Sequence, residues 1–179
     1  MHRTRERGFT LLELVLVLAL LALAATVVAV NMDALVPSSE LASAAQRIMA
    51  TIAHARAEAA LAGADAAVEY DFSAKCVRAL VPAPRRADGR ARELVTSDFR
   101  ADLPEGVALE AVLVSAGRPT SRGTLRIKVR HAGGMTAHVV HLAGGDGLVY
   151  SIEVHGPTGL ATLHDRRVAP PAALVDKPQ

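Results

Sequence analysis

The chain has 179 residues, enough for one globular domain of ordinary size together with one further segment. Apolar residues make up 51% of it, yet only 3% are aromatic and Trp is absent, so its core must be built from Ala, Val, Leu and Ile. The formal net charge of +2 is too small to favour a nucleic-acid-binding protein, and the basic residues are scattered along the chain. The single cysteine, Cys76, excludes a domain held together by internal disulfides.

A short basic segment opens the chain, and an almost unbroken apolar run follows it. Arginines occur within residues 2–8, whereas residues 14–32 contain no charged side chain. As a helix this run would span about 28 Å, close to the hydrocarbon thickness of a bilayer. The arginines before the run and Asp33 after it fit a basic end that stays in the cytoplasm and an exported C-terminal part. We therefore predict a transmembrane helix over residues 9–32.

Two ordinary explanations of such a start are a secretory signal peptide and an uncleaved signal anchor. The run is longer than the apolar core of a signal peptide, and no small-residue cleavage site clearly precedes a polar mature start. Glu13 also needs an explanation, because a carboxylate in a membrane span costs about 2–3 kcal/mol at the centre, and less near the interface. Such an acid generally has a partner.

The sequence Gly8-Phe9-Thr10-Leu11-Leu12-Glu13 resembles the processing motif of type IV pilins and of type II secretion pseudopilins. In that family a membrane-embedded prepilin peptidase cuts after the glycine and methylates the new N-terminal amine. The resemblance therefore implies a leader of residues 1–8, cleavage between Gly8 and Phe9, and N-methylation of Phe9. Glu13 would then lie four residues after the new terminus.

The amine that cleavage creates supplies a reason for Glu13. An unperturbed α-amino group has a pKa of about 7.7–8.0, so it is largely cationic at neutral pH. Among packed apolar helices, Glu13 of a neighbouring subunit can neutralise the Phe9 amine, and breaking such a buried pair typically costs about 3–5 kcal/mol. Filament assembly would then depend on processing, because the precursor has no amine at this place.

Residues 33–165 are predicted to form a globular head. Pro37 should bend or restart the helix, because proline lacks a backbone donor and clashes with the preceding turn. Apolar residues recur at three- and four-residue steps over 38–61, which predicts an amphipathic helix that ends near Gly63. The apolar face of this helix consists of Leu41, Ala44, Ala45, Ile48, Ile52, Ala55 and Ala59.

Six β-strands are predicted after the helix. Apolar and basic residues alternate over 124–130, which is typical of a sheet with one face exposed to solvent. Glycines at 133–134 and 144–147 indicate turns between strands. Residues 82–92 predict a basic loop, and residues 166–179 an extended tail. The predicted strands are residues 66–72, 76–81, 107–114, 124–130, 136–142 and 148–155.

The head most resembles the H-type minor pseudopilins and their type IV pilus relatives, the GspH/FimT group. Residues 40–48 and 54–59 of the helix carry the resemblance, together with 67–72, similar to that group's first strand, and 155–160, similar to its late turn before a last strand. It implies an α+β pilin-like fold. A long N-terminal helix, transmembrane in its first half, would pack on a small, mainly antiparallel β-sheet.

No set of residues predicts catalysis, a cofactor or a metal site. His138 and His141 are three residues apart, which on a strand points them to opposite faces, so they cannot chelate one ion together. The other histidines have no recognised zinc spacing. Cys76 is predicted to be a small buried strand residue, since nothing around it identifies a base. Residues 144–147 lack the Lys-Ser/Thr of a phosphate loop and are better explained as a hairpin turn.

These implications favour a structural subunit over an enzyme. The leading interpretation is a minor pseudopilin of a type II secretion system, a single-pass inner-membrane precursor with a cytoplasmic N-terminus and a periplasmic head, which joins other pseudopilins after cleavage. The alternative is a minor type IV pilin that primes a pilus or aids DNA uptake, the one case in which nucleic acid would be a partner. A distant third is a signal-anchored periplasmic enzyme, for which no convergent acid, base, nucleophile or metal set is visible.

Overall fold

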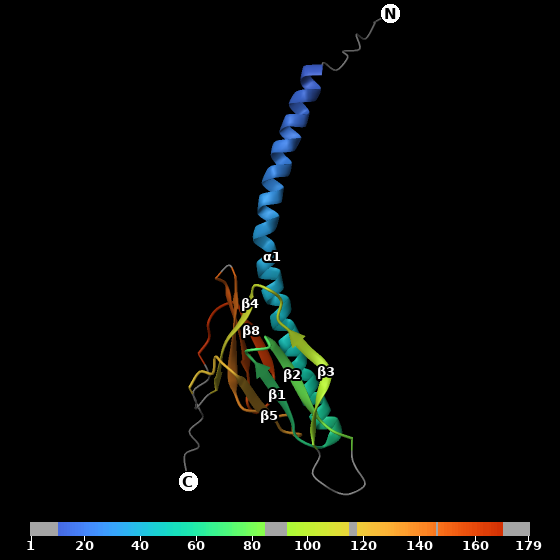
Figure 1. Cartoon of the computed structure of the whole chain (residues 1–179), viewed down its shortest axis with the longest axis vertical. Coiled ribbons are helices and arrows are strands. Elements are labelled where there is room, and N and C mark those ends of the chain that lie inside the picture. Colours follow the sequence, from blue (N-terminus) through green and yellow to red (C-terminus); the bar gives the residue numbers. More distant parts are fainter. Residues whose placement is uncertain (1–10, 85–92, 115–117, 146, 170–179) are drawn as a thin grey trace, which may run out of the picture. The chain divides into compact units, whose positions relative to one another are not determined.

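The computed structural model describes residues 11–84, 93–114, 118–145 and 147–169, with no side-chain description for 25–38. The chain divides into two compact units, Met1–Val36 and Pro37–Gln179. Helix α1 (Leu11–Ala62) contributes to both of them (Figure 1). Its helical backbone continues through Pro37, so the helix does not restart at this residue, and the alternative, a bend, stays a prediction. One proline removes a single backbone hydrogen bond, and the turns on either side are sufficient to keep the chain helical.

In the second unit, α1 is amphipathic as predicted. Every residue of the predicted apolar face is buried, with at most 1% of its surface exposed. Thr51 is buried among them, and its hydroxyl donates to the Arg47 carbonyl one turn earlier at 2.9 Å. The helix ends at Ala62, because Gly63 follows with a φ of +58°, a left-handed conformation that glycine adopts without steric cost.

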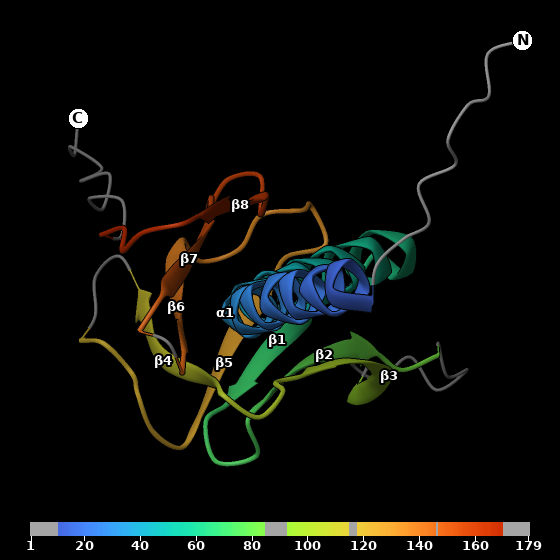
Figure 2. The ribbon, with the colours of Figure 1, turned by 90° about the horizontal axis from the view of Figure 1, so that it is seen from above.

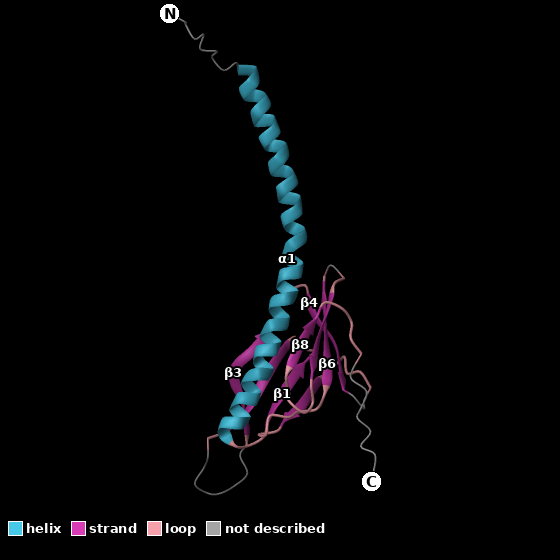
Figure 3. Cartoon of the chain, turned by 180° about the vertical axis from the view of Figure 1, so that it is seen from behind, coloured by secondary structure: helices cyan, strands magenta, loops and turns pink. Residues whose placement is uncertain are grey.

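Over the described part of the chain, eight strands follow the helix and form two antiparallel sheets. The first sheet has the order β3-β2-β1-β5 and the second the order β4-β6-β7-β8. Figure 3 shows the strands beside the C-terminal part of α1, and Figure 2 shows the two sheets on different sides of it. The strands are β1 (Ala66–Asp71), β2 (Cys76–Pro82), β3 (Leu94–Asp102), β4 (Val107–Val114), β5 (Thr124–Val129), β6 (His138–Gly144), β7 (Val149–Val154) and β8 (Ala161–His164).

The α+β, mainly antiparallel class is confirmed, and all six predicted strands are present. β6 begins two residues later than predicted, and the division of the strands into two sheets was not foreseen. β3 was missed because it is an edge strand whose residues are mostly exposed, so its sequence lacks the alternation that marks a half-buried strand. β8 follows the late turn at 155–160, as the resemblance implied.

A buried hydrogen bond joins the two sheets. The Tyr70 hydroxyl in β1 lies 2.8 Å from His138 Nε2 in β6, and both side chains are 0% exposed. His138 Nδ1 lies 2.7 Å from the Thr136 carbonyl, so Nδ1 carries the proton and Nε2 accepts from Tyr70. Burial raises the pKa of Tyr70, which keeps its hydroxyl protonated for this donation. The Tyr70–His138 pair therefore fixes how the sheets face each other.

Two predicted segments fall partly outside the described residues. Residues 85–92 of the predicted basic loop and 170–179 of the predicted tail are among those not described. Their proposed character stays a prediction. The first residues of the tail, 166–168, are described and contact the second sheet.

Candidate functional site

The N-terminal part of α1 presents apolar side chains on every side. All side chains of residues 11–24 are exposed. The large apolar ones range from 44% exposed at Val17 to 84% at Leu11. They are Leu11, Leu12, Leu14, Val15, Leu16, Val17, Leu18, Leu20, Leu21 and Leu23.

An apolar surface of this kind indicates contact with other molecules. A helix that packs on its own protein has one apolar stripe, whereas a helix that is apolar all round is normally buried on all sides. A contiguous exposed apolar surface of this size marks an interaction site. Over the residues whose side chains are described, no helix is both long enough and apolar enough to cross a membrane.

The structure describes only one of the three predicted processing residues. Gly8 and Phe9 lie outside the described residues. Glu13 lies in the first turn of α1, where its carboxylate is exposed among the apolar side chains. A carboxylate in the first turn also interacts favourably with the positive end of the helix dipole. The structure thus places the acid on the apolar segment, and its pairing role stays a prediction.

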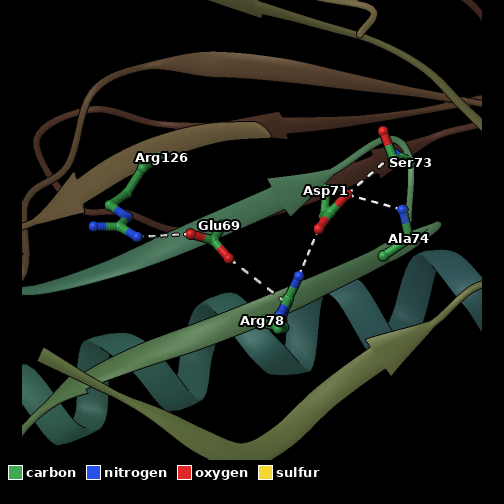
Figure 4. A network of polar contacts seen from close by, with 6 residues as sticks. All are labelled: Glu69, Asp71, Ser73, Ala74, Arg78 and Arg126. Carbon is green, nitrogen blue, oxygen red and sulfur yellow. Dashed lines mark hydrogen bonds and ion pairs between the residues drawn. The ribbon is translucent and has the colours of Figure 1, made fainter. Parts of the chain in front are cut away.

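A network of charges covers the outer face of the first sheet (Figure 4). Arg126 of β5 donates to Glu69 of β1 at 2.8 Å, and Arg78 of β2 lies 3.6 Å from the other Glu69 oxygen and 2.5 Å from Asp71. Asp71 also accepts from the backbone amides of the next turn, at residues 73 and 74, which lowers its pKa. Because each acid and base has its partner within the sheet, we interpret this network as a solvated face rather than a binding site.

Two of the stretches that resemble the GspH/FimT group meet in the structure. Arg56 of α1 donates to the Gly133 carbonyl at 3.3 Å, beside Gly159 of the late turn. Gly159 has a φ of +62°, and a Cβ there would lie 2.7 Å from both Arg56 Nε and the Gly133 oxygen. Only glycine fits this position, which explains its place in the turn. The sequence showed both stretches but not that they touch.

The predictions for histidine and cysteine can be followed residue by residue. His138 points inward to Tyr70, whereas His141 bonds Ser151, which is held by the residues after β8, so the two rings lie on opposite faces as predicted. Cys76 is buried in β2 as predicted, and burial raises the pKa of its thiol. Within the described residues, no three His, Cys, Asp or Glu side chains form a group that could hold a metal ion.

The Ser151–His141 pair could in principle be catalytic, because a hydrolase triad contains a serine hydrogen-bonded to a histidine. Their Oγ and Nδ1 atoms are 2.9 Å apart. However, Ser151 is 0% exposed, and its hydroxyl donates its proton to the Arg166 carbonyl at 2.6 Å. A nucleophile needs its proton directed at the base and its oxygen open to substrate. This pair therefore has a structural role.

Comparisons with known proteins found matches to the N-terminal segment and to the fold of the chain. Residues 3–29 match the prokaryotic N-terminal methylation motif. No curated protein matches the chain by sequence. Two solved structures of the minor pseudopilin EpsH, from the type II secretion system of Vibrio cholerae, are similar in fold to this chain, with TM-scores of 0.51 and 0.52.

Each EpsH structure is 16% identical to this chain. The matches cover 69% and 70% of this chain, and 94% and 96% of the EpsH chains. At this identity the likeness is one of fold, and the matched proteins are pseudopilins rather than enzymes. The chain therefore begins with a prokaryotic N-terminal methylation motif and continues into a head with the fold of the minor pseudopilins.

Proposed function

We propose that this protein is a minor pseudopilin of a type II protein secretion system. One observation carries the proposal: the methylation motif at 3–29 and a head of pseudopilin fold occur in the same chain. A signal anchor would account for the apolar run but not for the motif. An enzyme would need a convergent catalytic set, and the Ser151–His141 pair has a structural role, because the Ser151 hydroxyl donates to the Arg166 carbonyl.

The proposed life cycle follows from the order of segments along the chain. A prepilin peptidase removes residues 1–8 by cutting between Gly8 and Phe9, and Phe9 is then methylated. Residues 9–32 anchor the precursor in the inner membrane, with the head of residues 33–165 and the tail of 166–179 in the periplasm. The exposed apolar surface over 11–24 supports this step, because lipid first and neighbouring helices later would remove it from water.

Glu13 is proposed to set the register of assembly with the other pseudopilins. The Phe9 amine of one subunit meets Glu13 of another, so that neither charge is left alone among apolar helices. The position of Glu13 in the first turn of α1, on the apolar segment itself, supports this role. Its partners would be the neighbouring subunits of a hetero-oligomeric filament, with no small-molecule substrate and no cofactor.

The test begins with the intact mass of the protein extracted from membranes. We expect loss of residues 1–8 and the gain of one methyl group on Phe9. Gly8→Val should leave the full precursor, because the peptidase needs a small, flexible residue beside its catalytic groups. Ala24→Val adds similar bulk away from the cut and is the matched control, which should be processed normally. A wild-type chain that stays full length in cells with an active prepilin peptidase would disprove the assignment.

A second arm separates secretion from piliation. Deleting the gene should abolish export of folded proteins through the type II pathway, and the wild-type gene should restore it where the Gly8→Val gene does not. If the deletion instead removes surface pili while secretion continues, the protein is a minor type IV pilin. Both outcomes share the same processing chemistry, so the mass measurement alone does not decide between them.

A further inference from the structure

The chain turns back over the second sheet after β8. We call residues 166–168 the strap. Ser151 of β7 donates to the Arg166 carbonyl at 2.6 Å and accepts from the Val168 amide at 3.2 Å. Arg167 donates to both carboxylate oxygens of Glu110 in β4, at 2.6 and 2.7 Å. Because the strand order is β4-β6-β7-β8, a segment held on β7 and on β4 must cross β6.

His141 of β6 lies in the middle of this crossing. It pairs in register with Ser151 of β7, which pairs in turn with His164 of β8, so the three side chains form one row across the sheet. Figure 2 shows the segment after β8 running along the side of this sheet that faces away from α1. His141 is only 5% exposed, although it belongs to the face opposite the core. The strap, which contacts Ser151 and Glu110 on the two strands beside β6, crosses the face to which His141 belongs.

The hydrogen bonds around Ser151 determine where the proton of His141 lies. A serine hydroxyl has one donor and two acceptor positions. The donor goes to Arg166, and one acceptor position is taken by Val168. His141 Nδ1, 2.9 Å away, must therefore donate to the remaining position. The neutral ring carries its proton on Nδ1, and a second proton would have to enter at Nε2.

The charges around His141 make that second proton unfavourable while the strap is closed. Burial lowers the pKa of His141 most, Arg167 of the strap lowers it further, and Glu110 of β4 raises it. An imidazolium would repel Arg167 and compete with it for Glu110. Across β7, Glu153 and His164 also belong to this face, and their side chains bond each other at 2.9 Å. Detachment of the strap would hydrate the imidazolium and remove the repulsion.

We propose that the strap is a pH-sensitive device, closed over the second sheet while His141 is neutral and detached once His141 is protonated. Proton linkage gives the direction in which the population of the closed state changes with pH. The detached state binds the proton more tightly, so the closed state is fully favoured above the ordinary histidine pKa and loses population as the pH falls through the lowered one. The proposal does not depend on the proposed function, since it concerns only the head.

Amide hydrogen exchange on the full chain in detergent tests this directly. The protection of the Val168 amide, corrected for its intrinsic exchange rate, is compared between pH 8 and pH 5 with that of the β6 and β7 amides. We expect Val168 protection to fall by up to about tenfold per pH unit, the limit for one linked proton. The strand amides should stay protected over the same range.

Three variants separate the strap from a general loss of structure. His141→Asn keeps a donor near the Nδ1 position but cannot be protonated, so the strap should stay closed at pH 5. His164→Asn, in the same row, is the matched control and should keep the wild-type pH response. Arg167→Gln removes the ion pair at an exposed position and should lower Val168 protection at pH 8 without affecting the strands.

The proposal is overturned if wild-type Val168 protection does not change between pH 8 and pH 5. It is also overturned if protection in β6 and β7 is lost together with that of Val168, since the event would then be global unfolding. A His141→Asn protein that keeps the wild-type pH response would assign the proton to another group and would equally contradict it.

Discussion

Two stretches of α1 are both rich in apolar residues but have opposite surroundings. Residues 11–24 are rich in Leu and Val, and every side chain is exposed, whereas the apolar residues from Leu41 to Ala59 are almost completely buried. The second stretch alternates apolar and polar residues at helical spacing, so one face can pack on the sheets and the other can face water. The first stretch has no polar face. Its apolar side chains can leave water only by contacting other molecules.

The comparison separates what stabilises the head from what drives assembly. Removing a large aliphatic side chain from water is worth about 1.5–3 kcal/mol. In the head this free energy is gained on folding, within one chain. In residues 11–24 it is gained only when other molecules cover the helix, which under the proposed function are lipid and neighbouring subunits. Substitutions in the two stretches should therefore change different measurements.

The largest effect is expected at Glu13. Glu13→Leu should leave cleavage intact, because the cut site is untouched, but incorporation beside other subunits should be nearly lost. The Phe9 amine would remain unpaired among apolar helices, a penalty of about 3–5 kcal/mol or roughly a thousandfold in association. Crosslinking to the other pseudopilins, together with a secretion assay, measures this. Thr10→Ser is the control. Normal assembly of a correctly cleaved Glu13→Leu protein would remove the pairing role.

A matched pair of truncations compares the two stretches directly. Ile48→Ala should lower the free energy of unfolding of the head by about 2–5 kcal/mol, because it leaves a cavity between α1 and the sheets. Leu16→Ala, at a side chain 58% exposed, should change it by less than about 0.5 kcal/mol. Denaturant unfolding of the detergent-solubilised chain, followed by tyrosine fluorescence, gives both values. Equal losses would show that the N-terminal stretch also belongs to the folding unit of the head.

The Tyr70–His138 pair makes the stability of the head depend on pH. Burial lowers the pKa of His138 from 6.5 to about 4. The unfolded chain takes up this proton first, so the stabilisation is complete above pH 6.5 and decreases as the pH falls to 4, by about 3 kcal/mol in all. His138→Gln, which keeps an acceptor for Tyr70, should flatten this part of the stability–pH curve. An unchanged curve would assign the dependence to other groups.

The smallest effect is expected on the outer face of the first sheet. Arg126→Ala removes the ion pair with Glu69, in which the Arg126 side chain is 58% exposed. Solvent screening limits such pairs to about 0–1 kcal/mol, and Glu69 keeps Arg78 as a neighbour. Denaturant unfolding at low and high salt measures the change, which should decrease as salt rises. A loss above about 2 kcal/mol would mean that the network in Figure 4 supports the sheet cooperatively.

Local patterns predicted much of the head correctly. The apolar residues from Leu41 to Ala59 repeat at helical spacing over several turns, and each is buried. β4 was predicted with its observed bounds, because apolar residues are dense between two turn signals. The helix does not restart at Pro37, because the helical turns on both sides of the proline keep the chain helical. β3 was missed because an exposed edge strand needs no apolar pattern.

The candidate sites also differ in whether their residues are continuous in the sequence. The motif around Gly8, Phe9 and Glu13 could be recognised from sequence because it is one short continuous segment, and residues 3–29 match the methylation motif. The strap could not be recognised, because Glu110, His141, Ser151 and Arg167 come from four different segments of the chain.

The sequence by itself determined the order of segments, the helical face that is buried, most strand positions and the N-terminal motif. These depend on spacing along the chain, which is visible in a single sequence. Only the tertiary structure decided that the strands form two sheets, that Tyr70 bonds His138 between them, and that Gly159 meets Arg56. Each of these depends on contacts between residues far apart in the chain. Such contacts are selected by the packing of the whole head, and no local pattern records them.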